Sequence, residues 1–140
     1  MLNKIVARFK DGSIMKGKTN DFSPLKKHFH LEVIGGQVID VNMANLKVLE
    51  IDLAELKAAF FVKDFEGNKT YDEEYGDIVV GAGRKVQVTF ADGEVIIGFA
   101  LSYSPGRPGF FLVPADKKSN NERIYVITSS TKKVEFLQSS

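Results

Sequence analysis

Residues 4–31 read KIVARFKDGSIMKGKTNDFSPLKKHFHL, and residues 85–112 read KVQVTFADGEVIIGFALSYSPGRPGFFL. The two stretches align without a gap at a constant offset of 81 positions, from 4 to 85. They share an Asp-Gly pair, a later glycine, a Ser-Pro pair and a Phe-x-Leu ending. An internal repeat of this length predicts two small domains rather than one of average size.

Each copy begins with the pattern of a β-hairpin. Apolar and polar residues alternate over Lys4–Lys10, Asp-Gly follows, and a second apolar-rich run comes next, with the same order around Asp92-Gly93. Asp-Gly between alternating runs is the strongest short-range hairpin signal. The later glycine predicts a bulge or bend in the outgoing strand. A third strand is expected after each Ser-Pro pair, at Phe29–Val33 and Phe110–Val113.

The end of the first copy aligns with the end of the second in two ways. An offset of 75 sets Ile51–Val62 against Val126–Leu137, whereas an offset of 85 moves Val41 onto the start of the second segment. We favour the offset of 75 because it uses the Phe-rich run. Asp52 and Glu55 form a capping-box pattern that predicts a short helical turn. Each copy thus predicts five short strands, and the chain predicts an all-β protein of two tandem small barrels.

The repeat and the charge pattern together give the expected domain boundaries. Residues 1–62 form the first barrel, 63–83 an acidic linker and 84–140 the second barrel, and both barrels are mildly basic. The net charge of +1 is too small for a dedicated nucleic-acid binder.

Composition also limits the class of protein. The chain has no cysteine, and therefore no disulfide and no thiol nucleophile. It shows no signal-peptide pattern and no apolar run long enough to span a membrane. We expect a soluble, cytoplasmic, bacterial-type protein.

Three stretches carry a resemblance to a known family: NDFSP (Asn20–Pro24), LKAAFFVKDFEGN (Leu56–Asn68) and PGFFLVPADKKSNNERIYV (Pro108–Val126). They resemble an uncharacterised bacterial family of small β-barrel repeats, which implies a fold and no established activity. The Asp-Gly stretch Val88–Gly98 is similar to the first half of an SH3-like or Sm-like barrel. Sm-type RNA binders carry a Met-Asn pair after the bend and an Arg-Gly in the last turn. This chain has Ser-Pro loops at the first place and no Arg-Gly at the second.

The two Ser-Pro loops are the best candidate binding sites. Phe22 stands near Lys26 and Lys27 in the first loop, and Tyr103 stands near Arg107 in the second. Aromatic rings with cations can stack on a base or hold a phosphate or carboxylate. The alternative interpretation is that the aromatic residues belong to the core and that Ser-Pro fixes a turn.

A polar loop over residues 114–124 adds Lys117, Lys118 and Arg123, which can receive an anionic ligand. A plain hairpin loop explains the asparagines of this segment equally well. His28 and His30 share one face of a strand, but no third ligand follows at a suitable spacing, so no metal site is expected. The sequence also offers no nucleophile–base pair and no phosphate-binding glycine loop. We therefore expect no cofactor and no enzymatic activity.

The leading hypothesis is a non-enzymatic protein- or peptide-binding or scaffold module that uses the Ser-Pro loops and exposed strand edges. The alternative is a weak nucleic-acid-binding, Sm-like module. Its contact residues would be the loop cations Lys26, Lys27, Arg107, Lys117, Lys118 and Arg123. A homo-oligomer stays open, and no membrane partner is expected.

Overall fold

The computed structural model describes residues 3–37, 48–63, 84–101, 103, 106–115 and 121–137. Within these ranges the chain forms ten β-strands and two 3-10 turns, which confirms the prediction of an all-β protein. Apart from its first residue, the expected linker at 63–83 lies outside the described part of the chain. No helix among the described residues is long and apolar enough to cross a membrane.

The strands fall into two groups of five. The N-terminal half contains β1 (Asn3–Phe9), β2 (Ile14–Thr19), β3 (His28–Gln37), β4 (Val48–Asp52), the 3-10 turn η1 (Leu53–Glu55) and β5 (Leu56–Val62). The C-terminal half contains β6 (Arg84–Phe90), β7 (Val95–Leu101), β8 (Gly109–Pro114), β9 (Asn121–Ile127), the 3-10 turn η2 (Thr128–Ser130) and β10 (Thr131–Phe136).

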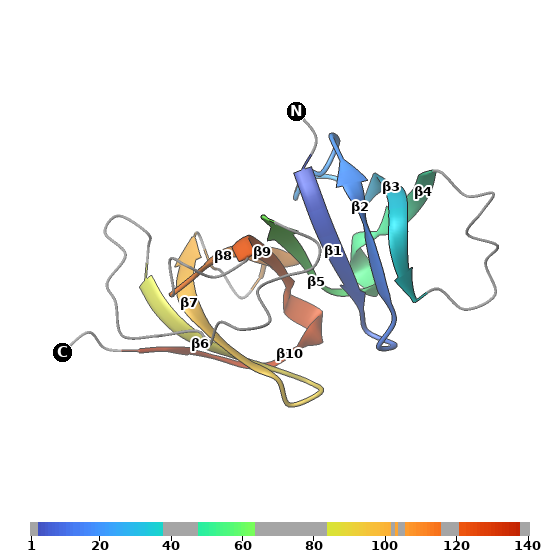
Figure 1. Cartoon of the computed structure of the whole chain (residues 1–140). Helices are drawn as coiled ribbons and strands as arrows, with labels where there is room; N and C mark the ends of the chain where they lie inside the picture. Colours follow the sequence, from blue (N-terminus) through green and yellow to red (C-terminus); the bar gives the residue numbers. More distant parts are fainter. Residues whose placement is uncertain are drawn as a thin grey trace, which may run out of the picture.

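All ten strands belong to one open sheet in the order β10-β6-β7-β8-β9-β5-β1-β2-β3-β4. Every neighbouring pair is antiparallel. The order β5-β1-β2-β3-β4 of the N-terminal half recurs as β10-β6-β7-β8-β9 in the C-terminal half. Figure 1 shows the two halves side by side, with β5 and β9 between them. We call the β5–β9 pairing the seam.

The strand registers of the two halves correspond position by position. Ile5 on β1 faces Phe61 on β5, and Val86 on β6 faces Phe136 on β10. The first partners are related by the offset of 81 and the second partners by the offset of 75. The strand pairing therefore agrees with the offset of 75 for the ends of the two copies, and the offset of 85 is wrong.

The two Asp-Gly pairs lie in hairpin turns, as expected. Gly12 and Gly93 have φ values of +93° and +96°, a region that glycine enters without steric cost. Their N–H groups donate to the carbonyls of Phe9 and Phe90 at 3.0 and 2.9 Å. Because β1 ends at Phe9 and β2 begins at Ile14, the loop is longer than the two-residue turn typical of Asp-Gly.

A helical turn also forms at the place that the capping pattern predicts. The carboxylate of Asp52 accepts a hydrogen bond from the Ala54 N–H at 2.9 Å, which starts η1. The C-terminal half has η2 at the corresponding position, after Ile127, without a side-chain cap. These turns connect the fourth strand to the fifth strand in each half, and the two strands lie at opposite ends of the strand order of that half.

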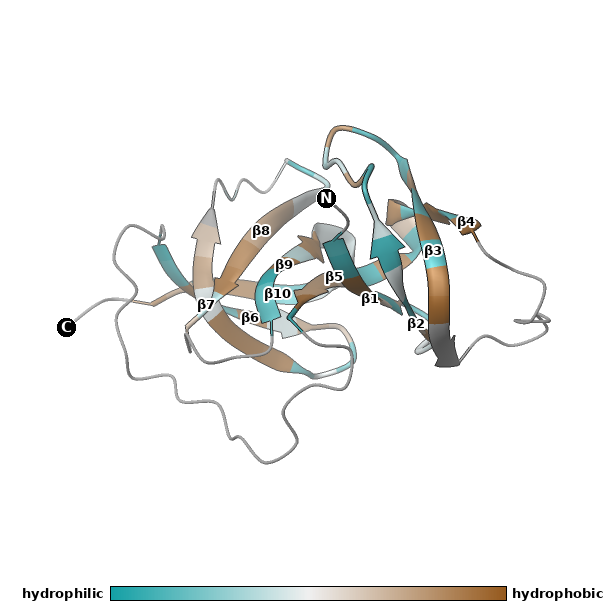
Figure 2. Ribbon diagram, turned by 45° about the horizontal axis from the view of Figure 1, so that its top comes forward, coloured by the Kyte–Doolittle hydropathy of each residue, from teal (hydrophilic) through white to brown (hydrophobic). Residues whose placement is uncertain are grey.

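The seam explains why the Phe-rich strand is apolar on both faces. All seven residues of β5 are buried. Phe61 belongs to a hydrophobic cluster with Phe29 and Leu31 of the N-terminal half, whereas Phe60 belongs to a second cluster with Phe90 of the C-terminal half. Figure 2 shows the hydrophobic colouring of β5 and β8 in the middle of the molecule. The two cores therefore meet along one strand pair.

One charged residue lies in this apolar strand. Lys57 is only 5% exposed, and its Nζ lies 2.6 Å from Oδ2 of Asp92 and also contacts the carboxylate of Glu94. The same ammonium lies 4.7 Å from the centre of the Phe90 ring. Arg8 adds a second ion pair to Glu94 at 3.1 Å. These contacts tie β1 and β5 to the β6–β7 hairpin of the other half.

Candidate functional site

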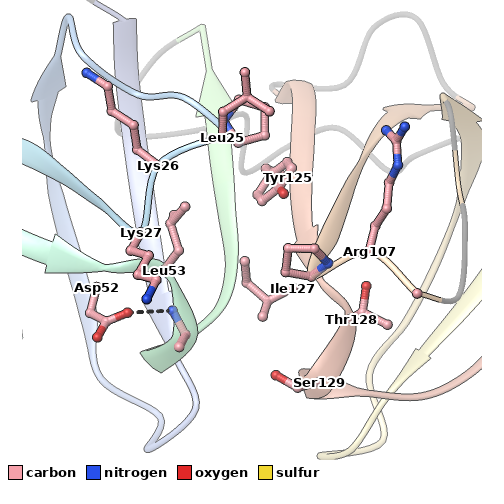
Figure 3. A pocket seen from close by; sticks show the side chains of 14 residues that line it. Leu25, Lys26, Lys27, Asp52, Leu53, Arg107, Tyr125, Ile127, Thr128 and Ser129 are labelled. Carbon is pink, nitrogen blue, oxygen red and sulfur yellow. Dashed lines mark hydrogen bonds between the residues drawn. The ribbon is translucent and has the colours of Figure 1, made fainter.

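A cavity of about 750 Å³ lies beside the seam, between the two halves. Its volume is within the range of pockets that bind small organic groups. The wall from the N-terminal half consists of Pro24, Leu25, Lys26, Lys27, Asp52, Leu53 and Ala54. The wall from the C-terminal half consists of Gly106, Arg107, Pro108, Tyr125, Ile127, Thr128 and Ser129. Figure 3 shows these side chains on both sides of the gap.

Both walls are built in the same way, from a Ser-Pro loop and the 3-10 turn that it rests on. The N–H of Leu53 donates to the carbonyl of Lys27 at 2.9 Å, and the N–H of Thr128 donates to the carbonyl of Pro108 at 2.9 Å. These hydrogen bonds hold each loop against its own turn. The seam then places the two loop–turn units opposite each other.

The base of the cavity is apolar and well packed. Leu53 and Ile127 are buried, and Tyr125 is 3% exposed. The Tyr125 ring makes an edge contact with Phe22 at a centroid distance of 5.4 Å. Burial raises the pKa of the Tyr125 phenol, and the positive charge of Arg107 opposes this shift only in part. Tyr125 therefore keeps its proton at neutral pH and can donate a hydrogen bond.

The lining also contains one exposed apolar residue and three cations. Leu25 is 95% exposed. Lys26, Lys27 and Arg107 line the same opening. The carboxylate of Asp52 is the acidic group of the lining, and it already accepts the hydrogen bond that starts η1. The local charge therefore favours an anionic group in a ligand.

A polar atom in the wall lacks a partner. The Thr128 hydroxyl oxygen is buried and has no hydrogen bond within the described part of the chain. A buried hydroxyl without a partner costs roughly 1–3 kcal/mol. A ligand that supplies a donor or acceptor here would remove this cost.

The structure brings together three of the residues singled out from the sequence. Lys26, Lys27 and Arg107 lie on the cavity, from loops far apart in the chain. Lys117 and Lys118 lie outside the described residues. Arg123 lies on β9 with its guanidinium 4.3 Å from the centre of the Phe61 ring and 5.5 Å from that of Phe111, so it covers the apolar surface beside the seam.

The two aromatic candidates take packing positions. Phe22 makes edge contacts with Phe29 and Phe61, each at a centroid distance of 5.1 Å. Tyr103 packs against Phe110 at 4.8 Å and Phe136 at 5.7 Å. Both rings therefore pack against the hydrophobic clusters, in line with the alternative that the sequence left open.

Sequence reasoning missed the apolar lining. Leu53, Tyr125 and Ile127 are ordinary strand and turn residues in the sequence. One signal was present: the offset of 75 relates Leu53 to Thr128, which places corresponding turns in both copies. The two turns line the same cavity because of the seam, and no local sequence pattern predicts that pairing.

The histidines lie near carboxylates without forming a metal site. Nδ1 of His30 lies 2.7 Å from Oδ2 of Asp21, and Nε2 of His28 lies 3.7 Å from Oδ2 of Asp52. Burial alone would raise the pKa of Asp21, but hydrogen bonds from His30 and Thr19 outweigh it and lower that pKa below its ordinary value. No group of three or more suitable side chains could hold a metal ion within the described ranges.

These features define an all-β protein with an apolar, cation-edged cavity between two similarly built halves. By sequence, residues 1–138 match the model of a family of unknown function, DUF6982, and the chain belongs to this family. No curated protein and no solved structure shows a significant match to the chain. The family therefore supplies no activity, and the site has to be interpreted from its own geometry.

Proposed function

We propose that this chain is a non-enzymatic binding module that takes up a peptide segment of a partner protein in the cavity between its halves. Each half is, in this proposal, a small SH3-like or Sm-like barrel, and the two are fused along the seam. The observation that carries the proposal is the meeting of both Ser-Pro loops and both 3-10 turns on one cavity. Two loops on one cavity can contact a longer peptide segment than one loop could.

The lining selects the chemistry of the segment. Leu53, Ile127 and the exposed Leu25 offer an apolar surface, and Lys26 and Arg107 line the same cavity. A peptide with one large apolar side chain and a neighbouring carboxylate matches both. Burial of a Leu- or Phe-sized side chain stabilises such a complex by about 1.5–3 kcal/mol. The ion pairs at the exposed edge contribute mainly to specificity and association rate.

Nucleic acid fits this site less well. Arg123 is stacked on the Phe61 ring, and Asp52 places a carboxylate on the opening. Affinity for nucleic acid comes mostly from many phosphate contacts and falls steeply with salt. An apolar cavity with a few cations at its edge predicts a weaker dependence on salt.

We also propose a cytoplasmic location. The chain contains no cysteine, so nothing in it depends on an oxidising compartment for disulfide formation.

The test is a selection of random twelve-residue peptides, displayed on phage, against the immobilised full chain. The selected peptide is then labelled with fluorescein and titrated by anisotropy, with a labelled single-stranded oligonucleotide in parallel. We expect the peptide to contain an apolar residue beside Asp or Glu. Leu25→Glu should weaken its binding by about tenfold or more, because it removes apolar contact and adds a like charge.

Val95→Glu is the matched control, because Val95 is also an exposed apolar residue, 46% accessible, and does not line the cavity. Equal effects of the two substitutions would contradict the proposed site. Tight binding of the oligonucleotide, with an affinity that falls steeply with salt, would favour the nucleic-acid hypothesis instead.

A further inference from the structure

The two outer strands of the sheet correspond to the two strands that form the seam. Among the described residues, β4 pairs only with β3 and β10 pairs only with β6. By the offset of 75, β10 corresponds to β5, and β4 corresponds to β9. The seam therefore joins the fifth strand of one half to the fourth strand of the other. The remaining fourth strand, β4, and the remaining fifth strand, β10, form the two ends of the sheet.

The seam is a head-to-tail contact with a defined register. Ala58 faces Val126 and Phe60 faces Ile124 across it. The contact between Lys57 and Asp92, at 2.6 Å, lies beside the seam and joins β5 of one half to the first hairpin of the other. A heterologous contact joins two different surfaces, so each molecule keeps one surface of each kind at its ends. The same contact can therefore be repeated between molecules.

The same contact can form between β10 of one chain and β4 of a second chain. Transferring the seam register by the offset of 75 places Phe136 of one chain opposite Val48 of the next. These two residues are among the exposed large apolar side chains, at 40% and 54%. Lys132 corresponds to Lys57, and Asp11 corresponds to Asp92. The repeated contact would therefore place Lys132 of one chain beside Asp11 of the next.

We propose that a second copy of this chain docks β10 against β4, repeating the seam between molecules. Charge supports this occupant: β10 carries Lys132 beside the ion pair of Lys133 with Glu135 at 3.3 Å, whereas β4 carries Glu50 and Asp52 and no basic residue. Continuity supports it as well, because the new contact extends the same ten-stranded sheet. This inference is independent of the proposed peptide function.

The assembly has a structural consequence. Each junction between chains brings the second Ser-Pro loop of one molecule opposite the first Ser-Pro loop of the next. A cavity like the one beside the seam is therefore expected at every junction. The assembly is either a closed ring or an open chain, because the contact is head-to-tail.

The test is sedimentation velocity on the full chain, from about 1 µM to about 1 mM, the range that weak interfaces cover. We expect the sedimentation coefficient to rise with concentration. Lys132→Glu and Asp11→Lys should each raise the dissociation constant by about tenfold or more, because each brings like charges together at the junction. An equimolar mixture of the two variants should recover association, since the new acidic side chain of the first variant then meets the new basic side chain of the second.

Glu122→Lys is the control, a charge reversal at an exposed position of β9 away from both edges. Circular dichroism spectra of all variants should match that of the natural chain, because Asp11 and Lys132 are exposed. A monomer at every concentration would overturn the proposal. Association that survives both single substitutions, or that the mixture does not restore, would overturn it too.

Discussion

The side chain of Lys57 joins the two halves of the molecule. Its aliphatic stem lies in the apolar seam strand, and its ammonium reaches Asp92 and Glu94 on the opposite hairpin. The cost of burying a lysine is offset when carboxylates and an aromatic ring surround the charge. Lys132, at the corresponding position of β10, is exposed, so the burial of Lys57 comes from the seam rather than from the strand itself.

Removing the partners of Lys57 should be costly. The double substitution Asp92→Asn and Glu94→Gln leaves a buried ammonium with neutral acceptors only. We expect the free energy of unfolding to fall by about 2 kcal/mol. This is less than the roughly 3–5 kcal/mol for a fully buried ion pair, because both carboxylates keep contact with solvent. Urea denaturation followed by circular dichroism measures the change. Asp11→Asn, in the corresponding turn without a buried lysine, should change it little.

The carboxylate of Asp92 should make the stability of the fold depend on pH. The hydrogen bond from Lys57, with a further one from the Glu94 N–H, lowers the pKa of Asp92 below its ordinary value of 3.8. A lowered pKa stabilises the fold above the ordinary value, and this contribution disappears as the pH falls through the pKa of the folded state. Urea midpoints should therefore drop below about pH 4. The urea midpoint of Asp92→Asn should drop less over the same pH range. The same drop in the variant and in the natural chain would show that Asp92 does not cause the pH dependence.

At the element scale, most strands could be predicted from the sequence. The alternation over Lys4–Lys10 and the Asp-Gly pair indicated the first hairpin, and the capping pattern indicated η1. The continuous burial of β5 could not be predicted in the same way, because its second face is covered by β9. That pairing sets Phe60 opposite Ile124. The sequence around either residue does not predict that the two residues pair.

The glycine that follows each Asp-Gly turn, Gly17 or Gly98, is required by the packing of neighbouring strands. The register between β2 and β3 shifts between Lys16 and Gly17, which confirms the predicted bulge in the first copy. In the second copy, a Cβ on Gly98 would lie 2.5 Å from the backbone carbonyl oxygen of Val113. The glycine is therefore needed for the close approach of two strands.

Gly98→Ala should destabilise the fold, because the backbone of β8 has to move. We expect a loss of about 1–3 kcal/mol, as for other overpacked core positions. Gly106→Ala is the matched control, since a Cβ at Gly106 has no atom within 4 Å. The comparison is made by thermal unfolding of the two variants. Similar melting temperatures would show that the close approach is not a constraint.

At the scale of the whole molecule, the sequence predicted two similar halves but not the way they meet. The loops that carry Lys26 and Arg107 were identified as two separate candidate sites. They line one cavity because β5 and β9 pair along the seam. The apolar residues of that cavity, such as Ile127, read as ordinary strand residues until the second half is placed beside the first.

The shared seam predicts the behaviour of separated halves. Fragments 1–75 and 76–140 should each lose stability, because each exposes an apolar face that the other covers. Mixing them should restore a β-type circular dichroism spectrum. Phe60→Glu in the first fragment should prevent this recovery, because Phe60 packs in the cluster of the C-terminal half, whereas Leu25→Glu should not. Two fragments that fold alone and ignore each other would contradict a shared core.

The cavity between the halves is the proposed binding site for a peptide segment. The most direct measurement is amide chemical-shift mapping by NMR, with the full chain titrated by the selected peptide. We predict that the largest shifts cluster at Leu25, Lys26, Arg107, Ile127 and Thr128, on both sides of the cavity. Shifts confined to one half, or gathered along the outer edges of β4 and β10, would contradict the claim.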